Sequence, residues 1–188
     1  HIIVLGTDEV GYGSPPKSGK TFREEALEKG DFDMSRLHFL GRVPYAEFVR
    51  VLQVSGVHIY LTVPFVLSWS MLEAMAAGCL VIGSRTAPVM EVIEHEKNGL
   101  LAEFFSPEEI ADQTDRVLDH PDRMQTLREA ARSTIIEGYD LKKCLQLQTR
   151  LISEMVKFAR QGPKGSTSNM QAKSETPSAT SGKEASAN

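Results

Sequence analysis

Cysteine is scarce in this chain of 188 residues, because only Cys79 and Cys144 occur and they lie far apart. They form no spacing typical of a zinc site or a disulfide framework, and this usage suits a reducing cytoplasm. Long apolar runs are also missing: none approaches the ~18 residues of a membrane span. No signal peptide is visible. We therefore expect a cytoplasmic protein without an integral membrane segment, and a peripheral place at the inner membrane is left open.

An excess of charge of one sign is lacking as well. The chain has 21 basic and 25 acidic side chains, a net charge of −4, and its Lys and Arg residues are scattered. A nucleic-acid partner is therefore not expected. The five histidines show no spacing typical of a metal site or a catalytic triad, so we expect no metal and no cofactor. The glycine-rich segment 11–20 lacks the spacing of a P-loop.

The two ends of the chain differ from its middle. Residue 1 is His1 rather than Met, and the first residues already have the composition of a strand. We interpret the chain as a fragment whose N-terminal part is absent. From residue 161 the composition changes to Ser, Thr, Gly, Ala, Lys and Pro, which cannot bury enough apolar surface to offset its ordering entropy. We expect one folded domain over 1–160 and a disordered low-complexity tail over 161–188.

Short apolar runs alternate with segments of helical period between these ends. Five runs are mostly continuous, as in strands that are buried on both faces: Ile2–Leu5, Leu37–Leu40, Val57–Val63, Leu80–Ile82 and Gly99–Ala102. Helices are expected at Thr21–Lys29, Pro44–Ser55, Ser70–Ala77, Val89–Glu94, Ser106–Leu118, Pro121–Ile136 and Asp140–Arg160. This order predicts an α/β fold with a doubly wound parallel sheet followed by C-terminal helices.

The segment from Val63 to Gly83 is the most informative in the chain. It reads as the end of a buried strand, a turn, a short helix opened by Ser68, Trp69 and Ser70, and a second buried strand. At the carboxyl edge of a parallel sheet, such a turn presents backbone N–H groups and the positive end of a helix, where phosphates bind. Ser70 and Glu73 also have the spacing of a capping box, so Glu73 could serve only to cap the helix.

The run Leu72-Glu-Ala-Met-Ala-Ala-Gly78 closely resembles the nucleotide-sugar site of GT-B glycosyltransferases of group 1, or family 4. In that family an acidic residue and seven others precede Glu-Ala-Met-Ala-x-Gly-x-Pro-Val. Phe65 stands in the first acidic position here, which is a departure from the pattern. The resemblance extends from His1 to about residue 160. It implies the Rossmann-like, donor-binding half of a GT-B fold.

The resemblance also implies roles for particular residues. Glu73 would accept hydrogen bonds from both hydroxyls of the donor's ribose, a role compatible with capping. Gly41 and Arg42 belong to a Gly-x-Val-Pro run that lies beside the nucleotide base in the family. The implied donor-binding set is Glu73, Ser68, Trp69, Ser70, Gly41, Arg42, Gly6 and Thr86, and no catalytic residue is assigned.

The implied function is to bind the donor in an enzyme that moves a sugar from a nucleoside diphosphate sugar to an acceptor hydroxyl. Family members usually retain the anomeric configuration and need no metal. The acceptor, whether glycan, lipid or small molecule, stays unknown, and the acceptor-binding N-terminal domain would lie upstream. This chain alone is therefore expected to bind nucleotide weakly and to transfer no sugar. Because of Phe65, a non-catalytic nucleotide-sugar-binding module stays open as an alternative, as does a GT-B-fold epimerase.

Overall fold

The computed structural model describes residues 1–10, 13–62 and 67–161. Phe65 and the predicted disordered tail, apart from its first residue, lie outside the described residues. The chain divides into two compact units, His1–Cys144 and Leu145–Asn188. The predicted domain boundary near residue 160 stays a prediction. All five strands and the whole candidate site belong to the first unit.

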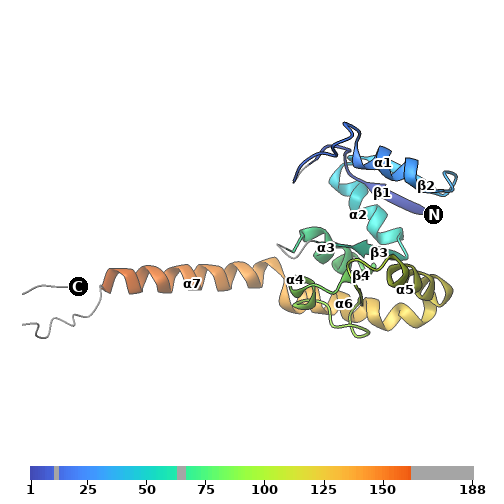
Figure 1. Cartoon of the computed structure of the whole chain (residues 1–188). Coiled ribbons are helices and arrows are strands. Elements are labelled where there is room, and N and C mark those ends of the chain that lie inside the picture. Colours follow the sequence, from blue (N-terminus) through green and yellow to red (C-terminus); the bar gives the residue numbers. More distant parts are fainter. Residues whose placement is uncertain (11–12, 63–66, 162–188) are drawn as a thin grey trace, which may run out of the picture. The chain divides into compact units, whose positions relative to one another are not determined.

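The first unit begins with a small parallel sheet. It consists of β1 (Ile2–Leu5) and β2 (Leu37–Gly41), with Ile2 opposite Leu37 and Val4 opposite Phe39. Helix α1 (Phe22–Lys29) connects the two strands along the chain. A capping box formed by Thr21 and Glu24 begins this helix. Two strands joined through a helix form the βαβ arrangement that the alternating pattern predicted (Figure 1).

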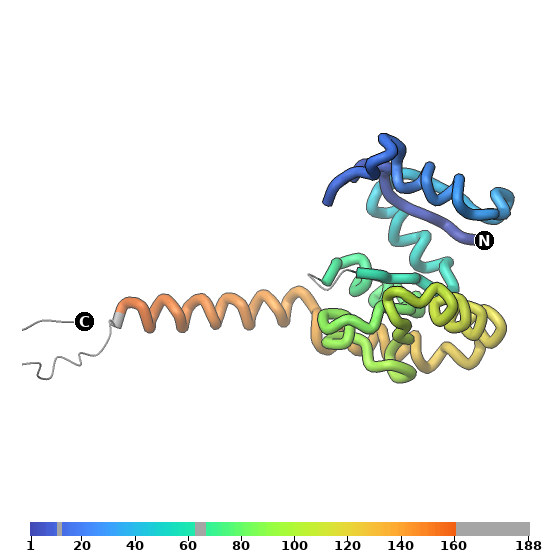
Figure 2. The backbone as a smooth tube through the Cα atoms, in the orientation of Figure 1, coloured from blue at the N-terminus to red at the C-terminus, as the bar shows by residue number. Residues whose placement is uncertain are grey.

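A second parallel sheet of three strands follows, in the order β3-β4-β5. Its elements, in chain order after α2 (Tyr45–Val54), are β3 (Val57–Tyr60), α3 (Trp69–Ala77), β4 (Leu80–Ser84), α4 (Ala87–Met90) and β5 (Leu100–Ala102). The chain passes through α2 from the first sheet to the second (Figure 2). Ile82 of β4 lies opposite Ile59 on one side and Leu100 on the other, so β4 is the central strand.

Helices follow the last strand, as expected. They are α5 (Pro107–Asp119), α6 (Gln125–Gly138) and α7 (Leu141–Gln161), with a 3₁₀ turn over Pro121–Met124 before α6. The Ser106 hydroxyl accepts a hydrogen bond from the backbone of Glu109, and the Asp140 carboxylate accepts from the backbone of Lys142. Each is the first residue of a helix range predicted from the sequence, and Ser and Asp are preferred N-cap residues, so both predicted helix starts are confirmed.

The three-stranded sheet is packed on both faces, which confirms the doubly wound architecture. On one face Val81 and Leu101 pack with apolar side chains of α2, α3 and α6. On the other face Leu80, Ile82 and Leu100 pack with side chains of α5 and the 3₁₀ turn. Every residue of β4 and β5 is buried. Continuous apolar runs therefore predicted these two strands correctly.

Strand β1 differs from the prediction of burial on both faces, because Ile2 is 62 % exposed and Val4 39 % exposed. Both core clusters of the described residues are built around β3, β4 and β5. All residues of α1 keep some exposure, so this helix contributes little apolar cover to β1 and β2. The apolar run therefore predicted the strand correctly but not its burial.

Burial gives the two cysteines different expected reactivity. Cys79, at the entry to β4, is 1 % exposed, and this burial raises the pKa of its thiol to about 11. Only about one Cys79 thiol in a thousand is then ionised at pH 8, and the thiolate is the reactive form. Cys144 is half-buried. A thiol reagent at pH 8 should modify Cys144 first and Cys79 only after unfolding, as measured by mass spectrometry of peptides. Equal labelling rates in the folded protein would contradict this burial.

Candidate functional site

The beginning of α3 lies at the carboxyl end of β3. Ser68 is the N-cap residue, and its hydroxyl accepts a hydrogen bond from the backbone N–H of Ser70 at 3.3 Å. The two serine hydroxyls are 3.1 Å apart, and Trp69 between them is 78 % exposed. The backbone N–H of Ser68 donates to the hydroxyl of Tyr60, the last residue of β3, at 2.7 Å. This contact ties the start of α3 to the end of the strand.

Glu73 lies in the second turn of α3, whereas a capping box with Ser70 would place it in the first turn. With Ser68 as the N-cap, the third helical residue is Met71, and the N–H of Ser70 is already bonded to Ser68. The predicted capping box between Ser70 and Glu73 is therefore wrong. The Glu73 carboxylate instead accepts a hydrogen bond from the hydroxyl of Tyr45, at 3.0 Å from Oε1.

A buried hydroxyl holds the turn that follows β4. Ser84, the last residue of β4, is fully buried, and its Oγ accepts a hydrogen bond from the backbone N–H of Thr62 at 3.3 Å. Thr86 is the N-cap residue of α4, and its hydroxyl lies 3.3 Å from that of Ser84. The residues that follow β3 and β4 are thus linked side by side at the carboxyl edge of the sheet.

The other predicted residues lie at the carboxyl ends of β1 and β2. The backbone N–H of Gly6 donates to the carbonyl of Gly41 at 2.9 Å, and φ at Gly41 is +65°, a left-handed conformation that favours glycine. Both glycines line a pocket of about 750 Å³. Arg23 also lines it, with its guanidinium 3.9 Å from the centroid of the Phe39 ring and 3.4 Å from the Asp8 carboxylate.

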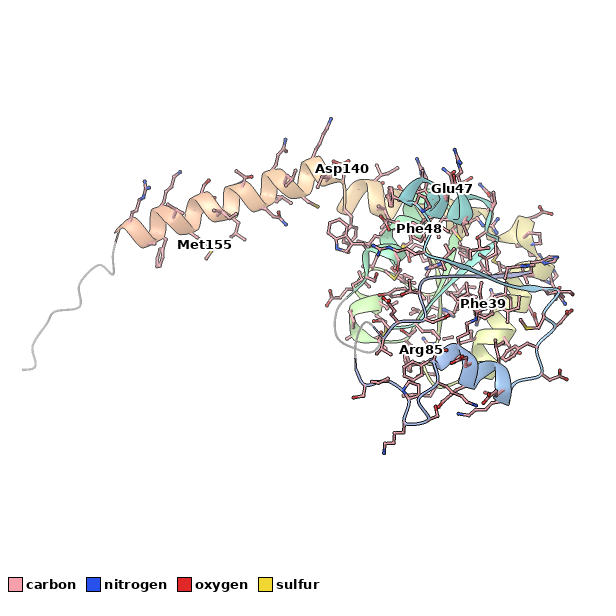
Figure 3. All side chains as sticks on the ribbon, turned by 90° about the horizontal axis from the view of Figure 1, so that it is seen from above. Phe39, Glu47, Phe48, Arg85, Asp140 and Met155 are labelled. Carbon is pink, nitrogen blue, oxygen red and sulfur yellow. The ribbon has the colours of Figure 1, made fainter. Side chains whose placement is uncertain are left out.

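Two arginines that follow strands differ in their partners. Arg85, after β4 (Figure 3), pairs with Glu103 at 2.8 Å and with Glu109 at 3.3 Å. Within the described part of the chain, Arg42 is exposed and makes no ion pair. A phosphate or nucleotide base would therefore meet an Arg42 guanidinium that has no ion-pair partner among the described residues, whereas the charge of Arg85 is already neutralised by two carboxylates.

The predicted residues thus form two groups. One contains Ser68, Trp69, Ser70, Glu73 and Thr86 at the edge of the three-stranded sheet, and the other contains Gly6, Gly41 and Arg42 at the edge of the two-stranded sheet. The bond between Tyr45 and Glu73 connects the first group to the helix that follows Gly41 and Arg42. Sequence reasoning missed Tyr45 and Ser84. Only their places, just after a predicted Gly-x-Val-Pro run and two residues beyond a predicted strand, could have drawn attention to them.

The residues that the structure describes at this edge include no cluster of metal-ligating side chains. Among the described residues, no group of three His, Cys, Asp or Glu side chains is placed to hold a metal ion. None of the helices in that same part of the chain is long and apolar enough to cross a membrane. The expectation of a metal-independent site stays a prediction.

Comparison with known proteins agrees with this architecture. The family described as glycosyl transferases group 1 matches residues 17–134, which include every element from α1 to β5. The chain therefore belongs to the group 1 glycosyltransferase family. It is 25 % identical over 148 residues to an uncharacterized glycosyltransferase of Methanocaldococcus jannaschii, covering 78 % of this chain and 36 % of that protein. It is 26 % identical over 127 residues to N-acetyl-α-D-glucosaminyl L-malate synthase of Bacillus anthracis, covering 68 % and 33 %.

Solved structures share the fold. HepE of Anabaena, in complex with UDP-glucose, superposes with a TM-score of 0.70 at 18 % identity and covers 81 % of this chain and 40 % of its own. Sucrose-phosphate synthase of Thermosynechococcus elongatus gives a TM-score of 0.66 at 19 % identity, with 82 % and 38 % covered. The chain thus spans about a third of the length of the curated relatives it matches. The fold is that of a Rossmann-like part of a GT-B glycosyltransferase.

Proposed function

We propose that the chain is the donor-binding part of a glycosyltransferase that moves a sugar from a nucleoside diphosphate sugar to an acceptor hydroxyl. The transfer would retain the anomeric configuration and need no metal. One observation carries the proposal. The Glu73 carboxylate does not cap α3, and the helix that carries it begins, with two serine hydroxyls, at the carboxyl edge of the sheet.

In this proposal the donor's diphosphate lies at the start of α3. Backbone N–H groups of the first turn, the hydroxyls of Ser68 and Ser70, and the positive end of the helix dipole would stabilise its charge. The same groups would stabilise the nucleoside diphosphate as it leaves. Glu73 would accept hydrogen bonds from the ribose hydroxyls, and Thr86 would border the donor at the carboxyl edge of the three-stranded sheet. Family membership and the UDP-glucose bound by HepE support this assignment.

The second group of residues would lie beside the nucleotide base. Gly6 and Gly41 bring bare backbone to the pocket edge, and Arg42 offers a guanidinium without an ion-pair partner within the described residues. Trp69 is an exposed aromatic side chain beside the proposed diphosphate position. The acceptor would be bound by an N-terminal domain upstream of this chain, in the cytoplasm or at the surface of the inner membrane.

Two alternatives remain: a non-catalytic nucleotide-sugar-binding module and a GT-B-fold epimerase. A radiolabelled donor separates them from the transferase. The 188-residue chain alone should transfer no sugar, whereas the protein extended upstream should transfer it to an acceptor. Donor binding by the extended protein without turnover would favour the binding module. Release of free sugar without an acceptor would favour the epimerase.

A further inference from the structure

We propose that Tyr45 is a positioning residue, which holds the Glu73 carboxylate in the orientation that accepts both hydroxyls of the donor's ribose. This inference rests on the proposed function. Tyr45 and Glu73 are 28 residues apart in sequence and come from different helices, yet the phenol hydroxyl lies 3.0 Å from Oε1 of the carboxylate. The contact therefore depends on the packing of α2 against α3 and on nothing local to either helix.

The phenol ring is anchored where α2 begins. Tyr45 is the first residue of α2, directly after the N-cap Pro44. Its ring lies 6.2 Å from that of Phe48. Phe48, which Figure 3 labels, packs against the core cluster that includes Met71 and Met75 of α3. Tyr45 is nevertheless 66 % exposed, so it faces the solvent side of the site. The ring contact with Phe48 and the hydroxyl contact with Glu73 restrict this side chain, so it loses little conformational entropy when a ligand binds.

The hydrogen bond leaves the carboxylate able to bind a diol. An ionised carboxylate has two oxygens with about four lone-pair positions. The Tyr45 hydroxyl occupies one position on Oε1, and within the described residues Oε2 and the remaining lone pair of Oε1 stay available. The carboxylate in turn raises the pKa of the Tyr45 phenol. Tyr45 therefore remains a neutral hydrogen-bond donor at physiological pH, which is the state that the contact requires.

The expected loss of nucleotide affinity in a variant without the Tyr45 hydroxyl follows from the rotamer entropy of the Glu73 side chain. A half-buried glutamate without a partner would sample several rotamers, and ordering it on binding would weaken the affinity about two- to tenfold. Tyr45→Phe keeps the ring and its contact with Phe48 but removes the donor. We therefore expect this variant to lose affinity for a ribonucleotide and to keep its melting temperature.

A thermodynamic cycle tests the proposal. Calorimetric titration of the 188-residue chain with UDP, GDP and ADP would identify the nucleoside diphosphate that binds best. Wild type, Tyr45→Phe, Glu73→Gln and the double variant would then be titrated with that nucleotide and with its 2′,3′-dideoxy form. Tyr139→Phe, at the end of α6, is the matched control and should bind as wild type does.

The expected result is a two- to tenfold loss for Tyr45→Phe on the ribonucleotide, no loss on the dideoxy form, and a smaller loss in the Glu73→Gln background, where the contact joins two neutral groups. An equal loss on both nucleotides would overturn the proposal, because Tyr45 would then only tie α2 to α3. Unchanged affinity for the ribonucleotide would overturn it as well. Wild type that binds none of the three nucleotides would instead refute the proposed function, and the inference with it.

Discussion

Replacing Glu73 with glutamine is expected to weaken nucleotide binding about ten- to a hundredfold while the melting temperature changes little. Hydrogen bonds to a charged acceptor contribute about 1.5–3 kcal/mol, and the amide of glutamine keeps one oxygen but loses the charge. Stability should hold because Glu73 caps no helix: Ser68 is the N-cap of α3. The glutamine oxygen also remains able to accept the hydrogen bond from Tyr45. Calorimetric titration and thermal unfolding measure the two quantities.

Glu47→Gln is the matched control for this variant. Glu47, labelled in Figure 3, lies in the first turn of α2, half a turn from Tyr45. It pairs with Arg50 at 2.6 Å on the surface. Exposed pairs of this kind contribute little to stability. We expect Glu47→Gln to bind nucleotide as wild type does. A large fall in melting temperature for Glu73→Gln, with unchanged affinity, would assign Glu73 a structural role and contradict the proposed site.

Replacing Ile82 with alanine is expected to destabilise the protein by about 2–5 kcal/mol, the range for emptying a well-packed aliphatic site. Ile82 is fully buried at the centre of β4 and packs with Leu80, Leu100 and Val117. The cavity should have little freedom to collapse, because strands flank Ile82 on both sides. Denaturant unfolding measures the change as a shift in midpoint at constant m-value.

Ile59→Ala provides a control with the same chemistry and a different burial. Ile59 lies opposite Ile82 in the neighbouring strand β3 and is 45 % exposed. Its replacement should cost about 1 kcal/mol or less, because far less apolar surface returns to water. Equal losses for the two variants would show that β4 is not the central buried strand of the sheet.

Fold class was predictable because the central strands leave a simple pattern. Leu80–Ile82 is a continuous apolar run, and a strand covered by helices on both faces requires one. The start of α5 was predictable too, because Ser106 and Pro107 carry the signals of an N-cap and a first helical position. The exposure of β1 was not predictable, since it depends on how little apolar surface α1 supplies.

The details of the site depended on tertiary contacts. Both Ser68 and Ser70 are good N-cap residues, and local sequence favoured Ser70 because Glu73 follows at the capping-box spacing. The structure selects Ser68, whose backbone N–H is bonded to the Tyr60 hydroxyl at the end of β3 and which therefore stays outside the helix. The bond between Tyr45 and Glu73 likewise joins distant segments, and no local pattern encodes such a contact.

Chemical-shift mapping of the ¹⁵N-labelled 188-residue chain during titration with UDP, GDP and ADP tests the central claim most directly. The claim is that a nucleoside diphosphate binds where α3 begins. We predict that one nucleotide shifts the amide signals of residues 68–73 most strongly, together with those of residues 41–45 and Thr86. Saturating shifts confined to another part of the chain, or no shifts with any of the three nucleotides, would contradict it.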